Sequence, residues 1–262
     1  MPTRFKLQTW SVLVALCVIS CGEGEESGSS EGKQEAPTKL VVEVDSVETA
    51  PPSQNSQGAV QAVLAGVFDE LEAVDIIRDE ALDARGTDHK WTAAELGTLA
   101  AQTSNLQVDA RTIKLHALFV DGTYAGDPSG SHILGLTLGS EHLVVFKEKL
   151  KEICSTGIYA SMTESDGKVL CDNSESAVWL HEIGHLLGLV NQGLPAVSDH
   201  EDKDHPGHTK SDESVMYWAY DWSSFNSGVV DLIYKRIMVG RMEPLDFGAA
   251  CEADLAAAKE EM

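Results

Sequence analysis

Apolar and polar positions alternate in several short stretches of the first half of the chain, which is typical of strands. Residues 39–47, KLVVEVDSV, alternate and are rich in β-branched side chains, so they are predicted to form a half-buried strand. Residues 74–82 and 112–122 carry similar patterns and are also predicted to be strands. Residues 142–150, HLVVFKEKL, fit a strand as well, although the second part of this stretch also fits a helix.

Between these stretches, apolar residues recur at helical spacing. Residues 59–74 place an apolar stripe on one face of a predicted amphipathic helix, and its members are Val60, Val63, Leu64, Val67 and Leu71. A second predicted helix begins at Thr92, which is followed three residues later by Glu95, the pattern of a capping box.

A third helix is predicted over residues 174–190, SESAVWLHEIGHLLGLV, with Ser174 or Ser176 as its N-cap and Gly188 near its end. Residues 228–239 and 252–262 also have helical character. Strands and helices therefore alternate up to the third helix, and mostly helix and loop follow it. This order predicts an α/β (α+β) fold in which a twisted sheet packs on helices, followed by a smaller, irregular C-terminal subdomain.

The N-terminal residues differ from the rest of the chain. Residues 1–20 combine two basic residues with an apolar run that is too short to span a bilayer as an ordinary helix, so they are predicted to be a signal peptide. Residues 21–38 are rich in Gly, Ser and Glu and are predicted to be a disordered tether. The folded domain is then expected over residues 39–262.

The end of the signal peptide, VISC at residues 18–21, resembles a bacterial lipobox, in which the cysteine is lipidated and becomes the mature N-terminus. This resemblance implies an exported protein of the bacterial cell envelope, held to the membrane through Cys21. Gly22 follows the cysteine, where an Asp often signals retention in the inner membrane, so the outer membrane is favoured.

The charge of the chain excludes one class of partner. It carries 42 acidic and 19 basic residues and a formal net charge of −23. Nucleic-acid binding needs clustered basic groups that displace counterions, so nucleic acid is not an expected partner.

Cysteine usage is consistent with export. Beyond the signal peptide and Cys21, the chain holds Cys154, Cys171 and Cys251. An oxidising compartment favours a disulfide between Cys154 and Cys171, which would close a short loop just before the third helix and leave Cys251 unpaired. The alternative is three free thiols.

The third helix contains the sequence HEIGH, in which His181 and His185 are four residues apart and Glu182 follows the first of them. Positions i and i+4 share one face of a helix, so both imidazoles can be directed at one zinc ion. Glu182 lies beside that ion and can act as the general base that takes a proton from the attacking water. This is the H-E-x-x-H arrangement of zinc peptidases, and it predicts hydrolysis of peptide bonds in a peptide or protein substrate.

The longer stretch HEIGHLLG resembles the start of the metzincin signature, in which a glycine lets the chain turn out of the helix. Residues 214–218, SVMYW, are similar to the methionine turn that metzincins place beneath the metal, with Met216 as the methionine. The resemblance implies a metzincin-like fold and a zinc-dependent endopeptidase.

One position departs from that signature. Metzincins have a third metal ligand three residues after the glycine, where this chain has Asn191, and an amide is a poor zinc ligand. His200, His205 and His208 follow downstream. The stretch HTKSDESVM has the histidine-to-methionine spacing of the archaemetzincin branch, so His208 is the predicted third ligand, with His205 second and Asn191 third. Residues 191–207 would then be an insertion.

Two features of this branch are replaced. Thr209 and Ser214 stand where archaemetzincins have cysteines, so a second, structural zinc built on such cysteines is not expected. The loop also carries six acidic residues that suit Ca²⁺, but their spacing does not match an EF-hand, and a solvated acidic loop is the preferred interpretation. They are Asp199, Glu201, Asp202, Asp204, Asp212 and Glu213.

Two alternatives remain open at this point. In gluzincins a glutamate from a second helix is the third ligand, a role that Glu201 or Glu213 would have to take here. The other alternative is a non-catalytic, lipid-anchored surface module whose zinc site is structural, and therefore closed by four protein ligands, or degenerate.

Overall fold

The computed structural model describes residues 36–220, 222–224 and 227–260, without the side chains of 222–224 and 227. Its centre is a five-stranded sheet in the order β2-β1-β4-β8-β7, and only β7 runs antiparallel to its neighbour. The strands are β1 (Lys39–Val47), β2 (Ala73–Leu82), β4 (Thr112–Phe119), β7 (Gly135–Leu138) and β8 (His142–Val145). The mixed α/β fold class predicted from the sequence is therefore confirmed.

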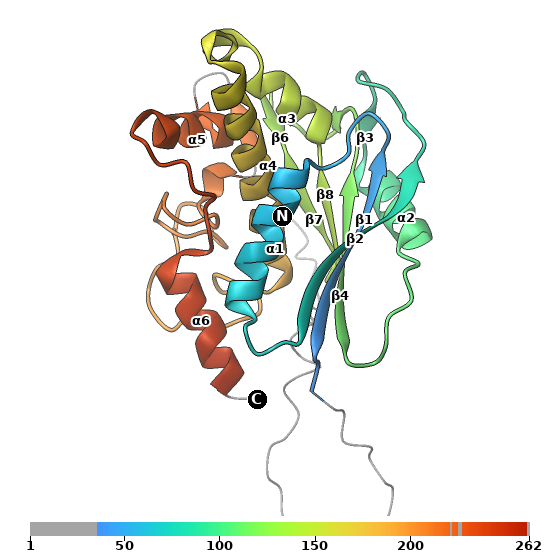
Figure 1. The fold of residues 1–262 in the computed structure, drawn as a ribbon, viewed down its shortest axis with the longest axis vertical. Helices are drawn as coiled ribbons and strands as arrows, with labels where there is room; N and C mark the ends of the chain where they lie inside the picture. The colour runs from blue at the N-terminus through green and yellow to red at the C-terminus, as the bar shows by residue number, and fades with distance from the viewer. Residues whose placement is uncertain (1–35, 221, 225–226, 261–262) are drawn as a thin grey trace, which may run out of the picture.

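Helices cover both faces of this sheet (Figure 1). On one face lie α1 (Gln54–Val67) and α4 (Glu164–Leu186), and on the other lies α2 (Ala93–Thr103). The order of the strands explains this division. The connection from β1 to β2 runs toward one edge of the sheet, and the connection from β2 to β4 runs back past β1 toward the other edge. Right-handed crossovers in opposite directions place their helices on opposite faces.

The remaining elements extend the helical layer and the loops. Helix α3 (Lys147–Cys154) follows β8, whereas α5 (Val229–Met238) and α6 (Gly248–Glu260) lie beyond α4 and α1, away from the sheet (Figure 1). Short elements connect these parts: β3 (Lys90–Trp91), β5 (Thr123–Tyr124), β6 (Ser131–Ile133), β9 (Trp222–Ser224), β10 (Ser227–Gly228), and the 3₁₀ helices Gly157–Ser161 and Trp218–Tyr220.

Most of the predicted elements are present. The first strand has the predicted bounds, and the capping box of Thr92 and Glu95 forms at the start of α2. The stretch 142–150 divides into strand β8 and helix α3. Helix α1 begins earlier than predicted, at Gln54, because Ser53 caps it by accepting from Ser56 N.

The predicted N-cap of the histidine helix is wrong. Helix α4 begins at Glu164, and its cap is Thr163, whose side chain accepts from Asp166 N. Ser174 and Ser176 lie fully buried within the helix. The polar residues 172–176 are buried inside the helix, so the stretch before Ala177 lacks the amphipathic pattern on which the prediction depended.

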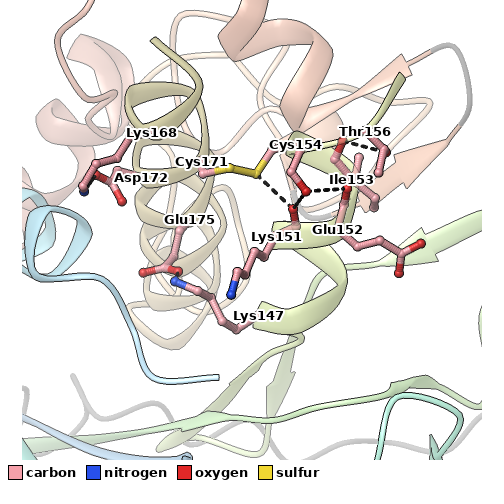
Figure 2. The surroundings of a disulfide bond; sticks show 11 residues. Lys147, Lys151, Glu152, Ile153, Cys154, Thr156, Lys168, Cys171, Asp172 and Glu175 are labelled. Atoms are coloured by element: carbon pink, nitrogen blue, oxygen red, sulfur yellow. Dashed lines mark hydrogen bonds and ion pairs between the residues drawn. A yellow bond between two sulfur atoms is a disulfide. The ribbon is translucent and has the colours of Figure 1, made fainter. Parts of the chain in front are cut away.

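The predicted bond between Cys154 and Cys171 is confirmed and joins α3 to α4 (Figure 2). Nearby, Lys147 of α3 pairs with the buried carboxylate of Glu175 on α4, and Lys168 pairs with Asp172 at 2.6 Å (Figure 2). The disulfide and the pair of Lys147 with Glu175 attach α3 to the half of α4 that precedes the histidines, whereas the pair of Lys168 with Asp172 lies within α4.

The predicted signal peptide and lipobox, and nearly all of the predicted tether, lie outside the described residues. Within residues 36–220, 222–224 and 227–260, no helix has the length and apolar character needed to cross a bilayer.

Candidate metal centre

Three histidines meet at the C-terminal end of α4. One ring nitrogen each from His181, His185 and His208 lies within 4.8 Å of the other two. Nε2 of His181 is 3.0 Å from Nε2 of His185, and the ring of His208 lies 5.1 Å and 5.0 Å from their centroids. The helical spacing of four residues thus produces the predicted convergence, and His208 joins it from the following loop.

The end of α4 turns the chain sharply. Gly188 has φ 77° and its carbonyl accepts from Leu194 N. The next two residues with a left-handed backbone are Val190, at φ 55°, and Asn191, at φ 62°. A buried β-branched residue rarely adopts this conformation, so the surrounding structure must hold Val190 in it.

Asn191 and Glu201 organise the loop that leads to His208. The amide of Asn191 donates to Oε2 of Glu201 at 3.0 Å and accepts from Ala196 N at 3.1 Å. The other oxygen of Glu201 accepts from Gly207 N at 3.0 Å. Asn191 therefore closes the loop and takes no place among the three converging nitrogens.

Helix α6 fixes the middle of the same loop. The carboxylate of Asp254, which is 1% exposed, accepts from Val197 N at 2.7 Å and binds Nε2 of His200 at 2.7 Å. The backbone of Asp202 then donates to the carbonyl of His208 at 2.7 Å. These contacts account for the return of the chain to α4 at His208.

Residues 214–218, the segment that resembles a methionine turn, lie against α4 next to the histidines and are called the floor segment below. The carbonyl of Val215 accepts from Nδ1 of His181 at 2.6 Å. Met216 is fully buried, and its sulfur and terminal methyl group lie against Gly184, between the two helical histidines. A side chain at position 184 would overlap Met216, so this glycine permits the close approach.

The hydrogen bonds of the rings leave nitrogens directed at the common centre. Because Nδ1 of His181 donates to Val215, its Nε2 carries a lone pair. Nδ1 of His208 donates to the carbonyl of His205 at 3.3 Å, and its buried Nε2 has no hydrogen-bond partner. A buried acceptor without a donor is costly, and a cation among the three nitrogens would remove that cost.

Burial favours the uncharged form of the three imidazoles. Burial, together with neighbouring imidazoles, lowers the pKa of His181 well below its usual value and that of His185 to about 3. Burial also lowers the pKa of His208. Neutral imidazoles are the form that binds metal ions, so the donor set fits zinc, which accepts three nitrogens and keeps a fourth position open.

Glu182 lies beside this cluster and does not belong to it. The residue is 2% exposed, and its Oε2 accepts from the hydroxyl of Thr137 on β7 at 2.6 Å. The group of converging ligand atoms comprises the three histidines without Glu182. A carboxylate in this position can exchange protons with a water molecule at the centre.

The structure places the other candidate ligands elsewhere. His205 binds Asp202 at 2.8 Å and stacks on Trp218, with ring centroids 4.3 Å apart. Glu213, one of the two glutamates considered as a third ligand, pairs with Arg236 at 2.7 Å and with Arg241. Several acids of the loop are thus engaged in ion pairs or in turns of the backbone.

Thr209 and Ser214 form hydrogen bonds with backbone groups around Met216. Thr209 N donates to the carbonyl of Met216, and the hydroxyl of Ser214 accepts from Met216 N and donates to the carbonyl of Phe247. Cys251 lies buried beside Ser214, with the two side-chain atoms 4.0 Å apart. These contacts hold the floor segment against α6.

Four residues of the site were not predicted from the sequence. Gly184 is the second of the two variable residues in the HEIGH motif. Its position directly before His185 is the only sequence signal for its role. Val215 acts through its carbonyl, which carries no sequence signal. Gly135 and Thr137 come from β7, more than 40 positions before Glu182, and only the fold brings them to the site.

Comparison with known proteins adds little to this geometry. No protein-family model matches the sequence, and no curated protein matches it. Among solved structures, the chain is similar to the crystal structure of an archaemetzincin from Methanopyrus kandleri, with 14% identity, coverage of 85% of this chain and 97% of that chain, and a TM-score of 0.48. A likeness of this size carries no argument about ligands or activity.

Proposed function

We propose that this protein is a zinc-dependent metallopeptidase, with His181, His185 and His208 as the zinc ligands and Glu182 as the general base. The observation that carries the proposal is the convergence of three imidazoles, one of them fully buried (His181) and two partly buried (His185 and His208), beside the buried carboxylate of Glu182. A catalytic zinc site usually has three protein ligands, and three histidines are one such set, whereas structural sites are closed by four protein ligands.

Zinc held by these imidazoles would supply a Lewis acid that polarises a scissile carbonyl and lowers the pKa of a water molecule. Glu182 accepts the proton of that water as it attacks the carbonyl carbon, and then donates the proton to the leaving amine. The hydrogen bond from His181 to Val215 holds the first ring in the required tautomer. The turn after Gly188 and the loop to His208 bring in the third imidazole.

The alternative is a non-catalytic module with a structural zinc. Such a site would need a fourth protein ligand, and His205 was the nearest candidate in sequence. Its ring instead binds Asp202 and stacks on Trp218. Within the part of the chain that the structure describes, the three histidines are the group of ligand atoms that converges. This observation favours the catalytic interpretation.

The location of the protein is part of the proposal. The resemblance of residues 18–21 to a lipobox supports a lipid anchor at Cys21 and a place in the bacterial cell envelope, with the outer membrane favoured. The disulfide between Cys154 and Cys171 agrees with export to an oxidising compartment. The substrate is then a peptide or protein that reaches the envelope.

Peptide cleavage by the purified protein tests the proposal. The wild type is expected to cleave casein or a mixed peptide library, to lose activity with a chelator and to recover it with zinc. Glu182→Gln is expected to retain zinc and lose cleavage, whereas Glu164→Gln, at the opposite end of α4, is expected to cleave normally. Zinc retention by a wild type that cleaves nothing would reject the peptidase and favour the module.

A further inference from the structure

Strand β7 contacts Glu182 through two residues on one face. Gly135 and Thr137 are two positions apart, so both point toward α4, whereas Leu136 and Leu138 pack on the opposite side of the sheet. The hydroxyl of Thr137 is 2.6 Å from Oε2 of Glu182 and 3.2 Å from its backbone carbonyl.

Gly135 provides the space for the same side chain. A Cβ atom added at Gly135 would lie 2.7 Å from Cγ and 2.9 Å from Cδ of Glu182, and closer still to Oε1. No ordinary side chain fits there without moving the carboxylate. Gly135 therefore lets the stem of Glu182 lie directly on the β7 backbone, and Thr137 binds the carboxylate at its end.

We infer that Thr137 is a positioning residue, which holds the Glu182 carboxylate in its working orientation while Gly135 supplies the space for it. This role deepens the proposed function and rests on it, because Glu182 needs a fixed orientation only if it moves protons. The hydroxyl bonds to the carboxylate rather than to an imidazole, so it acts on the base and leaves zinc binding unchanged.

The position of β7 suits this role. The strand pairs with β8 in a regular antiparallel register, in which Thr137 lies opposite Leu143 and Leu136 opposite Val144. Both partners in β8 are fully buried. The hydroxyl is thus carried by the sheet and not by a loop, and groups on rigid elements hold catalytic side chains most precisely.

Three variants separate positioning from a structural role. Thr137→Val keeps the shape of the side chain and removes the hydroxyl, and Thr137→Ser keeps the hydroxyl. Thr123→Val makes the same change on β5, at another half-buried strand position, and serves as the control. The measurements are kcat and KM on one peptide substrate, together with bound zinc per chain.

Thr137→Val is expected to lower kcat about tenfold or more, since a small misplacement of a catalytic group has effects of this size. KM and zinc content are expected to stay within about twofold of the wild type. Thr137→Ser is expected to retain most of kcat, and Thr123→Val all of it. A wild-type kcat for Thr137→Val, or an equal loss in Thr137→Ser, would overturn the inference.

A second measurement keeps this test separate from that of the proposed function. Crystal structures of the wild type and of Thr137→Val show where the Glu182 carboxylate lies, whether or not the protein cleaves peptides. The carboxylate is expected to leave its place beside β7 in the variant. If it does so although the wild type cleaves no peptide, then Thr137 holds the carboxylate as described, and it is the proposed peptidase function that fails. If it stays in place, the positioning role fails.

Discussion

Gly184 lies directly against Met216, with Cε of the methionine 3.2 Å from the point where a Cβ of residue 184 would be. The sulfur would be closer still, and Cε1 of Phe247 would be 3.1 Å away. The floor segment therefore touches the backbone of α4 between the two helical histidines, and any side chain at position 184 would push it away.

Gly184→Ala is expected to destabilise the protein by about 1–3 kcal/mol, because a methyl group would be forced into a packed region. The shift of Met216 would also move Val215 and its bond to His181, so zinc affinity should fall. Chemical unfolding and zinc titration measure both effects. Gly167→Ala is the control on the same helix, where nothing lies within 4 Å, and it should be neutral or stabilising. Wild-type stability in Gly184→Ala would contradict the packing described.

His208→Ala and His205→Ala distinguish between the two candidate third ligands. His208→Ala removes one of three converging nitrogens and is expected to lower zinc affinity at least about a hundredfold, since two imidazoles alone bind zinc weakly. The ring of His205 is not one of the converging nitrogens, because it binds Asp202 and stacks on Trp218. His205→Ala should therefore retain one zinc per chain. Equilibrium zinc titration against a competing chelator provides the measurement. Retention in His208→Ala with loss in His205→Ala would reverse the assignment.

The disulfide between Cys154 and Cys171 has a sequence separation of 17. Loss of the cross-link is expected to lower the free energy of unfolding by about 3 kcal/mol, chiefly by freeing the unfolded chain. Urea unfolding of the wild type with and without reductant measures this. A Cys154→Ala/Cys171→Ala variant should unfold alike in both conditions. No effect of reductant on the wild type would contradict the bridge.

Zinc content should not change in the Cys154→Ala/Cys171→Ala variant, because Cys171 lies about 15 Å along α4 from His181.

Cys251 gives a prediction for alkaline pH. Burial raises the pKa of its thiol from 9.0 to about 12. Between these values the folded protein keeps the proton and the unfolded chain releases it, so stability falls as pH rises. The contribution of the protonated thiol to the free energy of unfolding is fully present below pH 9 and is lost progressively as the pH rises from 9 to about 12.

Measured unfolding free energies should therefore decline more steeply above pH 9 in the wild type than in Cys251→Ala. Unfolding curves at matched pH values give the two slopes. The comparison is made between variants because burial also raises the pKa of Tyr159 and Tyr220, which contribute equally to both. Identical slopes would show that the thiol titrates normally in the folded state.

Local patterns predicted the elements whose causes are local. The alternation in residues 39–47 is that of a strand, and it forms with those bounds. The capping box at Thr92 and Glu95 needs only four residues, and it forms as predicted. The convergence of His181 and His185 follows from helical geometry in the same way.

Long-range contacts explain what the sequence did not predict. The start of α4 was missed because Glu175 is buried against Lys147 and Ser56, so a polar stretch became the interior of a helix. The path of the chain to His208 depends on Asp254, more than 40 residues beyond it. The contact of Thr137 with Glu182 depends on the placement of β7 beside α4, which no pattern within either segment encodes.

A crystal structure with zinc tests the central claim most directly, because anomalous scattering locates the ion and the density shows the atoms around it. We expect one ion with nitrogens of His181, His185 and His208 at about 2.0–2.1 Å, and a fourth position not taken by the protein. A fourth protein ligand, or an ion bound away from these three rings, would contradict the account.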